Sequence, residues 1–497
     1  MEKHGAQRER ILALLREAGG LTAASARAVA EETGVPEADV WGAGSFYELL
    51  AHGPQDRRVC QGLSCILQGA AELEGEKVSC LGQCDRAPVV IGRDLGVLHA
   101  GRPRGGVTPD DPALPMNLAG ADRADGAALR AARAMGAERV LEELEASGLQ
   151  GRGGAGFPAH IKWRAVRSQP PGQRYVVCNA DEGEPGTFKD REIMLRRPHL
   201  LVEGLAIAAE TVGADVIYLY VRGEFPEERR SFERALTEAL PFAGHLDWRI
   251  VEGHGAYICG EETALIESIE GRRGMPRIKP PYPTEQGLWG KPTLMNNVET
   301  LACVPDILLR GGQRFRDLGR TEPGTKLYCI SGHVAVPGIY ELPLGVCLDE
   351  LVEAAGGYVG EPLAFSPGGA SSGFLPMAHR GLPLDFRGLP KVGSMLGSAG
   401  VVVLNDTVDL AEAAMWQSVF FEDESCGQCA PCRLGTQFVR QAVGRYRDSG
   451  DPTHLDHLDD VAWEMEEGSI CGLGMVAALP VQTARQHFPD HFAEREG

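Results

Sequence analysis

The chain has 497 residues with a formal net charge of −20 at pH 7, and 43% of its residues are hydrophobic. A chain of this length holds several domains, and its acidic balance excludes a sequence-independent nucleic-acid binder. The most apolar stretch, residues 200–221, is interrupted by three carboxylates, and the N-terminus lacks the apolar core of a signal peptide. We therefore expect a cytoplasmic protein without direct membrane insertion.

Helices, and then a short α/β segment, are predicted at the start of the chain. The predicted helices cover 8–18, 23–33, 37–50 and 66–73, and strand-like runs lie at 77–79 and 88–92. Residues 102–117 are rich in proline, glycine and aspartate, which is typical of a linker. The first predicted module spans residues 1–105.

Three further domains are predicted after the linker. Residues 118–318 alternate amphipathic helices with apolar strands such as 216–221, the pattern of an α/β fold. Residues 322–405 contain short strand-like segments and one helix at 348–355, an order that suggests a small β-grasp-like module. Residues 406–497 are predicted to be helical.

Four cysteines near the C-terminus have the spacing of an iron–sulfur ligand set. Cys426, Cys429 and Cys432 are spaced C-x2-C-x2-C, and Cys471 stands apart. A cubic 4Fe–4S cluster takes three thiolates from such a loop and a fourth from elsewhere in the fold. The alternatives are a disulfide pair and a structural zinc site, which more often has paired ligands. The spacing favours the cluster and hence the transfer of single electrons.

A second set of four cysteines lies near the N-terminus. Cys60 and Cys65 form a C-x4-C pair, and Cys80 and Cys84 form a C-x3-C pair. Two pairs suit a 2Fe–2S cluster with one pair on each iron, although spacing alone leaves zinc open. The other five cysteines are scattered among apolar residues, as expected for buried thiols in a reducing cytoplasm.

Residues 151–156 read Gly-Arg-Gly-Gly-Ala-Gly and contain the pattern G-x-G-x-x-G. A helix-like stretch precedes them in place of a strand, so the ordinary dinucleotide-binding context is missing. Glycines still let a phosphate or a flat ring approach the backbone closely, and Arg152 and Lys162 add charge for an anionic ligand. The alternative is a plain flexible turn.

Polar stretches at 179–186, 255–263 and 279–300 accompany the glycine-rich loop. Their carboxylates are either solvated loop residues or, among glycines and apolar strands, ligands for ribose or ribityl hydroxyls. Phe157 and Tyr282 are candidates for stacking on a planar cofactor, and core packing is the alternative for both.

Together these motifs resemble those of a known family. Residues 118–497 are similar to the NADH-binding flavoprotein subunit of complex I and to its relatives in soluble NAD-linked hydrogenases and formate dehydrogenases. The similarity rests on the motifs at 147–158, 178–191, 255–264, 280–283, 296–300 and 424–432.

Residues 1–100 resemble the small thioredoxin-like 2Fe–2S subunit of the same systems, through residues 34–47 and 80–88. Only fourteen residues separate Cys65 from Cys80, fewer than is usual in that family. We therefore expect a truncated thioredoxin-like fold that keeps the cysteine pattern.

The resemblance implies FMN under the glycine-rich loop. The residues expected to line FMN are Gly151, Arg152, Gly153, Gly154, Lys162, Asn179, Asp181, Tyr257, Gly260, Glu261, Asn296, Asn297 and Thr300. Those expected to meet NADH are Phe157, Glu182, Glu184, Glu262, Lys279 and Tyr282. No catalytic side chain is expected, because hydride transfer takes place on FMN. Glu262 is expected to disfavour NADPH by charge repulsion.

The implied fold is α/β multidomain. It comprises an N-terminal helical and truncated thioredoxin-like module, a Rossmann-like FMN domain, a β-grasp (ubiquitin-like) module and a C-terminal helical 4Fe–4S bundle. The implied function is exchange of hydride between NAD(H) and FMN, and of single electrons with the iron–sulfur clusters.

The expected parent enzyme is a soluble NAD-dependent formate dehydrogenase or hydrogenase, with this chain as its diaphorase (beta) subunit. Respiratory complex I (NADH:quinone oxidoreductase) is the alternative, which would make the protein peripheral to a membrane, and a non-catalytic iron–sulfur scaffold is a second alternative. The expected partners are other iron–sulfur subunits, which would carry the terminal donor or acceptor.

Overall fold

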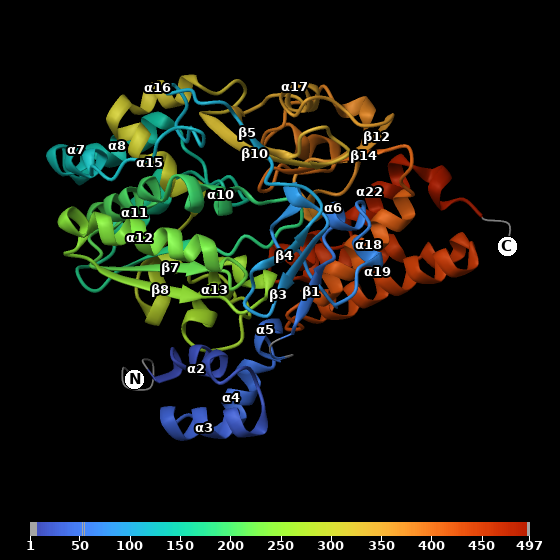
Figure 1. Cartoon of the computed structure of the whole chain (residues 1–497), viewed down its shortest axis with the longest axis horizontal. Coiled ribbons are helices and arrows are strands. Elements are labelled where there is room, and N and C mark those ends of the chain that lie inside the picture. Colours follow the sequence, from blue (N-terminus) through green and yellow to red (C-terminus); the bar gives the residue numbers. More distant parts are fainter. Residues whose placement is uncertain (1–6, 52, 54, 495–497) are drawn as a thin grey trace.

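The computed structural model describes residues 7–51, 53 and 55–494. Figure 1 shows a small helical bundle at the N-terminal end, a central cysteine-containing sheet, two larger sheet-containing regions and a helical C-terminal region. Within the described residues, no helix is both long enough and apolar enough to cross a membrane.

The N-terminal bundle consists of α2 (Ile11–Glu17), α3 (Ala23–Thr33), α4 (Glu37–Gly44) and α5 (Glu48–Ala51). Thr22 and Ser25 form a capping box at the start of α3, and Gly34 ends it in a left-handed conformation. The helix predicted at 37–50 is interrupted at residues 45–47, which turn the chain toward the largest domain.

The first cysteine set lies in a four-stranded sheet of order β2-β1-β3-β4, in which only β1 and β2 are parallel. The elements are β1 (Arg57–Cys60), α6 (Leu63–Ile66), η1 (Ala70–Glu72), β2 (Glu76–Val78), η2 (Cys84–Arg86), β3 (Val89–Gly92) and β4 (Val97–Ala100). The helix predicted at 66–73 is wrong, because the chain forms α6 earlier and then only a 3₁₀ turn. A short connection between the cysteine pairs leaves no room for a longer helix.

The largest domain is built on four parallel strands in the order β8-β7-β6-β9. The strands are β6 (Tyr175–Ala180), β7 (Val216–Val221), β8 (Asp247–Glu252) and β9 (Thr293–Asn297). The helices are α7 (Ala127–Met135), α8 (Ala137–Ser147), α9 (Ala159–Arg167), α10 (Lys189–Arg196), α11 (Pro198–Val212), α12 (Pro226–Ala243), η3 (Tyr257–Gly260), α13 (Glu262–Ile269), α14 (Pro283–Gln286), α15 (Val298–Arg310) and α16 (Gly312–Asp317).

The two faces of this sheet pack against different cores. On β7, Ile217 and Leu219 join the cluster formed with α11, α12 and α15, whereas Tyr218 and Tyr220 join a cluster that contains Tyr47 of the N-terminal bundle. This alternation follows from the two-residue period of a strand. The N-terminal bundle therefore covers part of one face of the parallel sheet β8-β7-β6-β9.

A six-stranded sheet of order β13-β12-β14-β10-β11-β5 follows. The elements of this region are β10 (Thr325–Gly332), β11 (Gly338–Pro343), α17 (Leu348–Ala354), β12 (Pro362–Ser366), η5 (Ala370–Ser372), β13 (Leu375–Pro376) and β14 (Gly400–Asn405). Its edge strand β5 (Gly106–Val107) comes from the predicted linker and pairs with β11. The linker is thus partly ordered by tertiary pairing that its proline and glycine content does not reveal.

The C-terminal region is helical, as predicted. It contains α18 (Leu410–Asp423), α19 (Ala430–Ser449), α20 (Leu458–Gly468), α21 (Gly472–Val476) and α22 (Leu479–His487). Figure 1 shows the cysteine-containing sheet β1–β4 lying between this helical region and the largest domain. The first cysteine set therefore lies next to the domain that carries the glycine-rich loop.

Candidate functional site

A cavity of about 610 Å³ opens where β6 and β9 end. These strands are neighbours in the sheet although far apart in sequence, so their carboxyl ends form a switch point of the kind where open α/β sheets bind ligands. Asn179 and Asn297 are paired in register at this edge, and both line the cavity. The volume is in the range of cofactor and small-molecule sites.

The glycine-rich loop between α8 and α9 forms one wall of this cavity. Its entry is fixed by a hydrogen bond from the Gly151 amide to the Phe157 carbonyl at 2.8 Å. A Cβ atom at Gly153 would lie 3.0 Å from the Cβ of Asn297, and Gly154 has a φ of 144°. Both positions therefore favour glycine, which leaves the backbone bare toward the cavity.

A second cavity of about 430 Å³ adjoins the first and shares Gly153, Gly154, Asn179 and Asn297 with it. It extends past Tyr257 and Glu184 to residues of η5 and α21. The two cavities therefore adjoin, and their combined lining runs from the glycine-rich loop to the helix that begins directly after Cys471.

The structure brings the predicted FMN and NADH residues together, with one exception. Those that line the joined cavities are Gly151, Gly153, Gly154, Phe157, Lys162, Asn179, Asp181, Glu182, Glu184, Tyr257, Gly260, Glu261, Glu262, Lys279, Tyr282, Asn296, Asn297 and Thr300. They come from five separate segments of the sequence.

The exception is Arg152, whose side chain is fully buried and does not line either cavity. Its guanidinium donates to the Pro323 carbonyl at 3.0 Å, on the side of the loop turned away from the ligand space. Only its backbone acts at the site, because the Arg152 amide donates to Thr300 Oγ1 at 2.8 Å and so holds the loop against α15.

Lysines and carboxylates are paired at the mouth of the first cavity. Lys162 Nζ lies 2.9 Å from Glu262 Oε2, and Lys279 Nζ lies 3.1 Å from Glu261 Oε1. Burial raises the pKa of Glu262, but Lys162 and Lys279 outweigh burial and hold that pKa below its usual value. Glu261 also caps α13 by accepting from the amides of Thr263 and Ala264.

A second carboxylate network lies deeper. The Tyr257 hydroxyl donates to Glu184, which also accepts from the Ser371 amide at 2.9 Å. Glu182 accepts from the amides of Asp190 and Arg191 at the start of α10. Burial is the main cause that raises the pKa of both Glu184 and Glu182.

Several lining residues were not anticipated from the sequence. Lys189 and Asp190 are buried beside Asn297, and Ser371 comes from the glycine- and serine-rich run 366–373. Leu473 and Val476 of α21 close the far side. Two signals were available: Lys189 and Asp190 lie within the motif at 178–191, and residues 366–373 are rich in glycine and serine. Leu473 and Val476 reach the cavity only through domain packing.

The C-terminal cysteines meet at the ends of two helices. Cys429 precedes α19, Cys432 lies in its first turn, and Cys471 precedes α21. A Cβ atom at Gly474 would lie 2.8 Å from the Cβ of Cys432, so α21 packs directly on that ligand. Burial and the neighbouring thiols raise the pKa of Cys432 to about 12. Thiolates here need a bound cation, which the iron of a cluster supplies.

The N-terminal cysteines also converge, and all four are buried. Cys80 Sγ lies 3.6 Å from Cys84 Sγ, and the amides of Gly62 and Leu81 donate to Cys60 Sγ at 3.4 Å. A Cβ atom at Gly62 would lie within 3.5 Å of both Cys60 Sγ and Cys80 Sγ. Converging thiols that accept backbone hydrogen bonds suit an iron–sulfur cluster.

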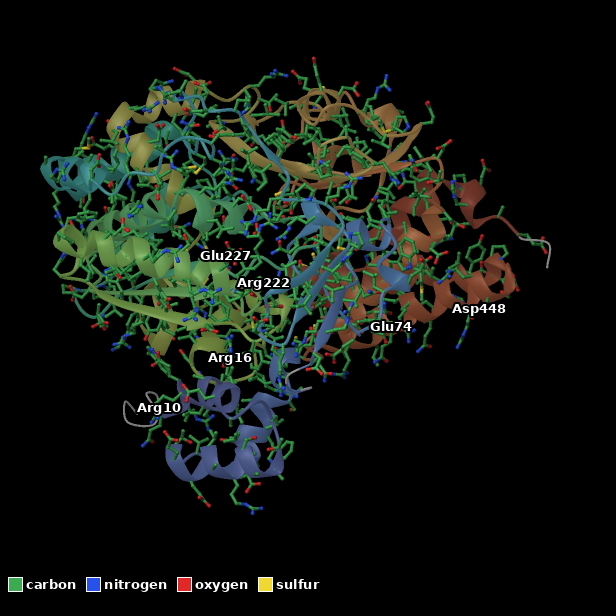
Figure 2. All side chains as sticks on the ribbon, in the orientation of Figure 1. Arg10, Arg16, Glu74, Arg222, Glu227 and Asp448 are labelled. Atoms are coloured by element: carbon green, nitrogen blue, oxygen red, sulfur yellow. The ribbon has the colours of Figure 1, made fainter. Side chains whose placement is uncertain are left out.

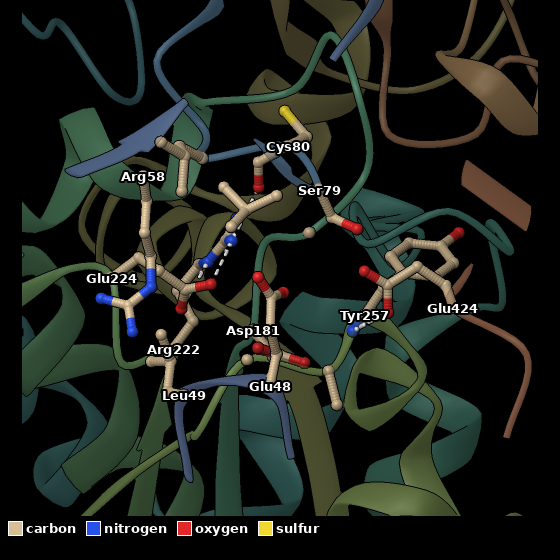
Figure 3. A pocket seen from close by; sticks show the side chains of 15 residues that line it. Glu48, Leu49, Arg58, Ser79, Cys80, Asp181, Arg222, Glu224, Tyr257 and Glu424 are labelled. Carbon is tan, nitrogen blue, oxygen red and sulfur yellow. Dashed lines mark hydrogen bonds and ion pairs between the residues drawn. The ribbon is translucent and has the colours of Figure 1, made fainter. Parts of the chain in front are cut away.

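A small polar pocket lies between this cysteine set and residues that line the second cavity (Figure 3). Arg222 lines this pocket: it donates to the Cys80 carbonyl at 2.8 Å and to the Glu182 carbonyl, and it pairs with Glu224 at 2.8 Å. One buried arginine thus connects the second cysteine loop with the loop that carries Glu182.

Three family models match the chain. Residues 144–306 match the Nuo51 FMN-binding domain, residues 412–495 match the NADH-ubiquinone oxidoreductase-F iron-sulfur binding region, and residues 327–375 match the SLBB domain. The chain is 44% identical over 373 residues to an F-type NADH-quinone oxidoreductase protein of Rhizobium meliloti (strain 1021), an alignment that covers 71% of this chain and 88% of that protein.

The chain belongs to the family of F-type NADH-quinone oxidoreductase subunits. The F-type relative from Rickettsia felis is 43% identical over 376 residues, covering 72% of this chain and 89% of that protein. A member of this family is an NADH-binding electron-transfer protein with FMN and a 4Fe–4S cluster, and this chain has the cavity and the cysteine set for both.

The structure is also similar to that of an NAD+-reducing [NiFe]-hydrogenase in the H2-reduced state. The TM-score is 0.89 at 30% sequence identity, and the match covers 97% of this chain and 92% of that chain. The expected mixed α/β multidomain fold with a helical C-terminal region is thereby confirmed. The F-type relatives match a smaller part of this chain than the hydrogenase chain does.

Proposed function

We propose that this chain is the diaphorase subunit of a soluble NAD-linked hydrogenase or formate dehydrogenase. The observation that carries the proposal is the joined cavity, which has the nucleotide residues at its mouth and the helix after Cys471 at its far side. Hydride exchange at one end and single-electron exchange at the other would then take place along these adjoining cavities.

FMN, when bound, supplies the conversion between a hydride and single electrons. The bare backbone of Gly153 and Gly154 would accept its close approach, and the amides of Asn179 and Asn297 would offer hydrogen bonds. The Lys162 ammonium adds a positive charge at the same wall. The chain's own contribution is therefore binding and orientation.

NAD(H) would enter between Phe157 and Tyr282, two residues that are 51% and 53% exposed. Two large exposed aromatic rings at a cavity mouth suit stacking on flat rings. Lys279 and Glu262 lie beside them, so the mouth also has charged groups for ribose and phosphate. This arrangement disfavours a non-catalytic scaffold that has lost its flavin site.

The N-terminal cysteines would hold a 2Fe–2S cluster as a side branch of the electron path. Cys60, Cys65, Cys80 and Cys84 are buried together, and Arg222 connects the Cys80 carbonyl with the nucleotide loop. The four-stranded sheet that carries them would be the truncated thioredoxin-like module, and the sheet at 325–405 would be the β-grasp module.

The parent complex is proposed from the share of this chain that each kind of relative matches. The hydrogenase match covers 97% of this chain, so nearly all of the region before residue 118 has a counterpart in that one chain. The alignments with the F-type relatives cover 71–72% of this chain. A single chain that combines both cysteine sets thus favours the hydrogenase-like architecture. The partners would be other iron–sulfur subunits, and complex I remains the alternative parent.

The test is purification of the intact complex under anaerobic conditions from the native host. We expect NADH-dependent ferricyanide reduction, a flavin absorption band, and nickel, molybdenum or tungsten in a partner subunit. A complex that lacks these three metals and reduces quinone would assign the chain to the complex I alternative. Absence of flavin and of ferricyanide reduction would overturn the diaphorase proposal itself.

A further inference from the structure

The N-terminal bundle packs against the loop that carries several of the nucleotide-lining residues. This loop follows β8 and runs from Gly253 to Gly274, and it includes η3, α13 and the cavity residues Tyr257, Gly260, Glu261 and Glu262. Figure 1 shows α2, α4 and α5 next to the β8 side of the largest domain. Figure 2 shows Arg16 at this junction, where it pairs with Glu252 at the end of β8.

The start of the loop is held by two backbone hydrogen bonds. The Glu48 amide donates to the Gly255 carbonyl at 3.0 Å, and the Leu49 amide donates to the His254 carbonyl at 3.0 Å. Gly255 has a φ of 76°, and a Cβ atom there would lie 3.0 Å from the Leu49 side chain. Residues 48–49 therefore fix the direction in which the loop leaves β8.

The end of the loop is held by Phe46 and Tyr47, the two aromatic residues directly before Glu48. The Tyr47 hydroxyl donates to the Arg272 carbonyl at 2.6 Å, and the Tyr47 side chain is fully buried. Phe46 lies under the Arg273 guanidinium at 5.6 Å, and a Cβ atom at Gly274 would lie 3.2 Å from the Phe46 ring. Four consecutive residues thus contact both ends of one loop.

The cavity residues lie between these two points of attachment. Tyr257 lies two residues after Gly255, and Glu262 begins α13, which ends three residues before Arg272. Fixing both ends lowers the conformational entropy that nucleotide binding would have to remove. The bundle is therefore placed to act on nucleotide affinity without touching the nucleotide.

We infer that the segment Phe46–Leu49 positions the loop 253–274 for nucleotide binding, which gives the N-terminal helical bundle a role in NAD(H) affinity. The inference rests on the nucleotide site proposed above. The family model for the FMN-binding domain begins at residue 144, so this role lies outside the region that the model describes. Phe46, Tyr47, Glu48 and Leu49 are positioning residues and do not line the first cavity.

The test compares Tyr47→Phe and Leu49→Ala with the matched control Val29→Ala in the FMN-loaded complex. Tyr47→Phe removes one hydroxyl and keeps the ring, whereas Val29 lies in the bundle core on α3, which Figure 1 shows turned away from β8. We expect the Kd for NAD+ alone to rise by about three- to tenfold for Tyr47→Phe and by roughly tenfold for Leu49→Ala. Val29→Ala should leave it unchanged.

Two further readouts distinguish a positioning role of Tyr47 and Leu49 from a general loss of domain stability. KM for NADH should rise while kcat for ferricyanide reduction stays within about twofold. Hydrogen exchange at 253–274 should quicken in Tyr47→Phe and Leu49→Ala only. Unchanged NAD+ affinity and unchanged exchange in both variants would overturn the inference, even if their unfolding temperature fell. Wild-type protein that binds no NAD+ would overturn the nucleotide site itself.

Discussion

Arg191 and Asp85 form a buried ion pair through two hydrogen bonds, from Nη1 to Oδ1 and from Nη2 to Oδ2, each 3.0 Å long. Asp85 follows Cys84 directly, and Arg191 lies in α10, whose first residues Lys189 and Asp190 line the second cavity. The same guanidinium donates to the Gly82 carbonyl at 3.0 Å. Arg191 therefore holds the loop that carries Cys80 and Cys84 on the largest domain, together with Arg222, which donates to the Cys80 carbonyl.

Asp85→Asn should loosen this contact strongly, because it leaves the Arg191 charge buried without its main partner. Removing one member of a buried pair costs about 3–5 kcal/mol. Hydrogen exchange over residues 57–100 should rise, and the denaturant midpoint should fall. The control is Arg320→Met, which breaks a partly exposed pair with Glu350 worth at most about 1 kcal/mol. Equal effects of the two substitutions would contradict the prediction.

The cysteine spacings and the glycine-rich loop were readable from the sequence because their meaning is local. Spacing in C-x2-C-x2-C fixes which thiols can share a cluster, and the cofactors FMN, 4Fe–4S and NAD(H) are confirmed by the family matches. The α/β class and the helical C-terminal region followed from apolar periodicity and are also confirmed.

Features that depend on long-range packing were not readable. Arg152 lies within a predicted ligand loop, yet its side chain turns to Pro323, and nothing local indicates that direction. Strand β5 forms only because β11 lies beside it. Ser371 and Leu473 reach the cavity through the docking of other domains. The residue-level assignments at the cavity remain predictions that the substitutions below address.

Glu262→Gln should relax the preference for NADH. The 2′-phosphate of NADPH brings negative charge toward a carboxylate whose lowered pKa keeps it ionised, so repulsion works against it. Removing the carboxylate also frees Lys162 and Lys279 to meet that phosphate. We expect kcat/KM for NADPH to rise about tenfold, with a change of at most about threefold for NADH.

Glu285→Gln is the matched control for Glu262→Gln, because Glu285 is an exposed carboxylate close to Tyr282 in the same mouth region. It removes the same charge from a position that does not line the cavity. An NADPH to NADH ratio that stays the same in Glu262→Gln, or that rises equally in Glu285→Gln, would remove Glu262 from the specificity argument.

Glu48 should make stability depend on pH. Burial, and then the carboxylates of Glu424, Glu224 and Glu76, raise the pKa of Glu48 from its usual 4.5 to about 8. The folded state therefore holds this proton more tightly than the unfolded state. The resulting stabilisation is fully present below about pH 4.5 and is lost as the pH rises toward 8.

Glu48→Gln should flatten this dependence, because glutamine does not titrate. The unfolding temperature should be a few degrees higher than that of the wild type at pH 8 and similar to it at pH 5. The comparison is Glu31→Gln, which changes an exposed carboxylate on α3. Parallel pH profiles for the wild type and Glu48→Gln would show that Glu48 is ionised at neutral pH.

Cys471→Ser should remove the 4Fe–4S cluster and leave the flavin site intact. Burial raises the pKa of Cys471 to about 11, so without iron this group is a neutral thiol and offers no thiolate. We expect a loss of about four irons per chain, retained FMN, and NADH-dependent flavin bleaching that no longer passes electrons to a partner protein. Cys84→Ser should instead remove about two irons.

Cys303→Ser is the matched control, since Cys303 is buried in α15 away from both sets. Iron loss from Cys303→Ser, or full iron content in Cys471→Ser, would contradict the ligand assignment.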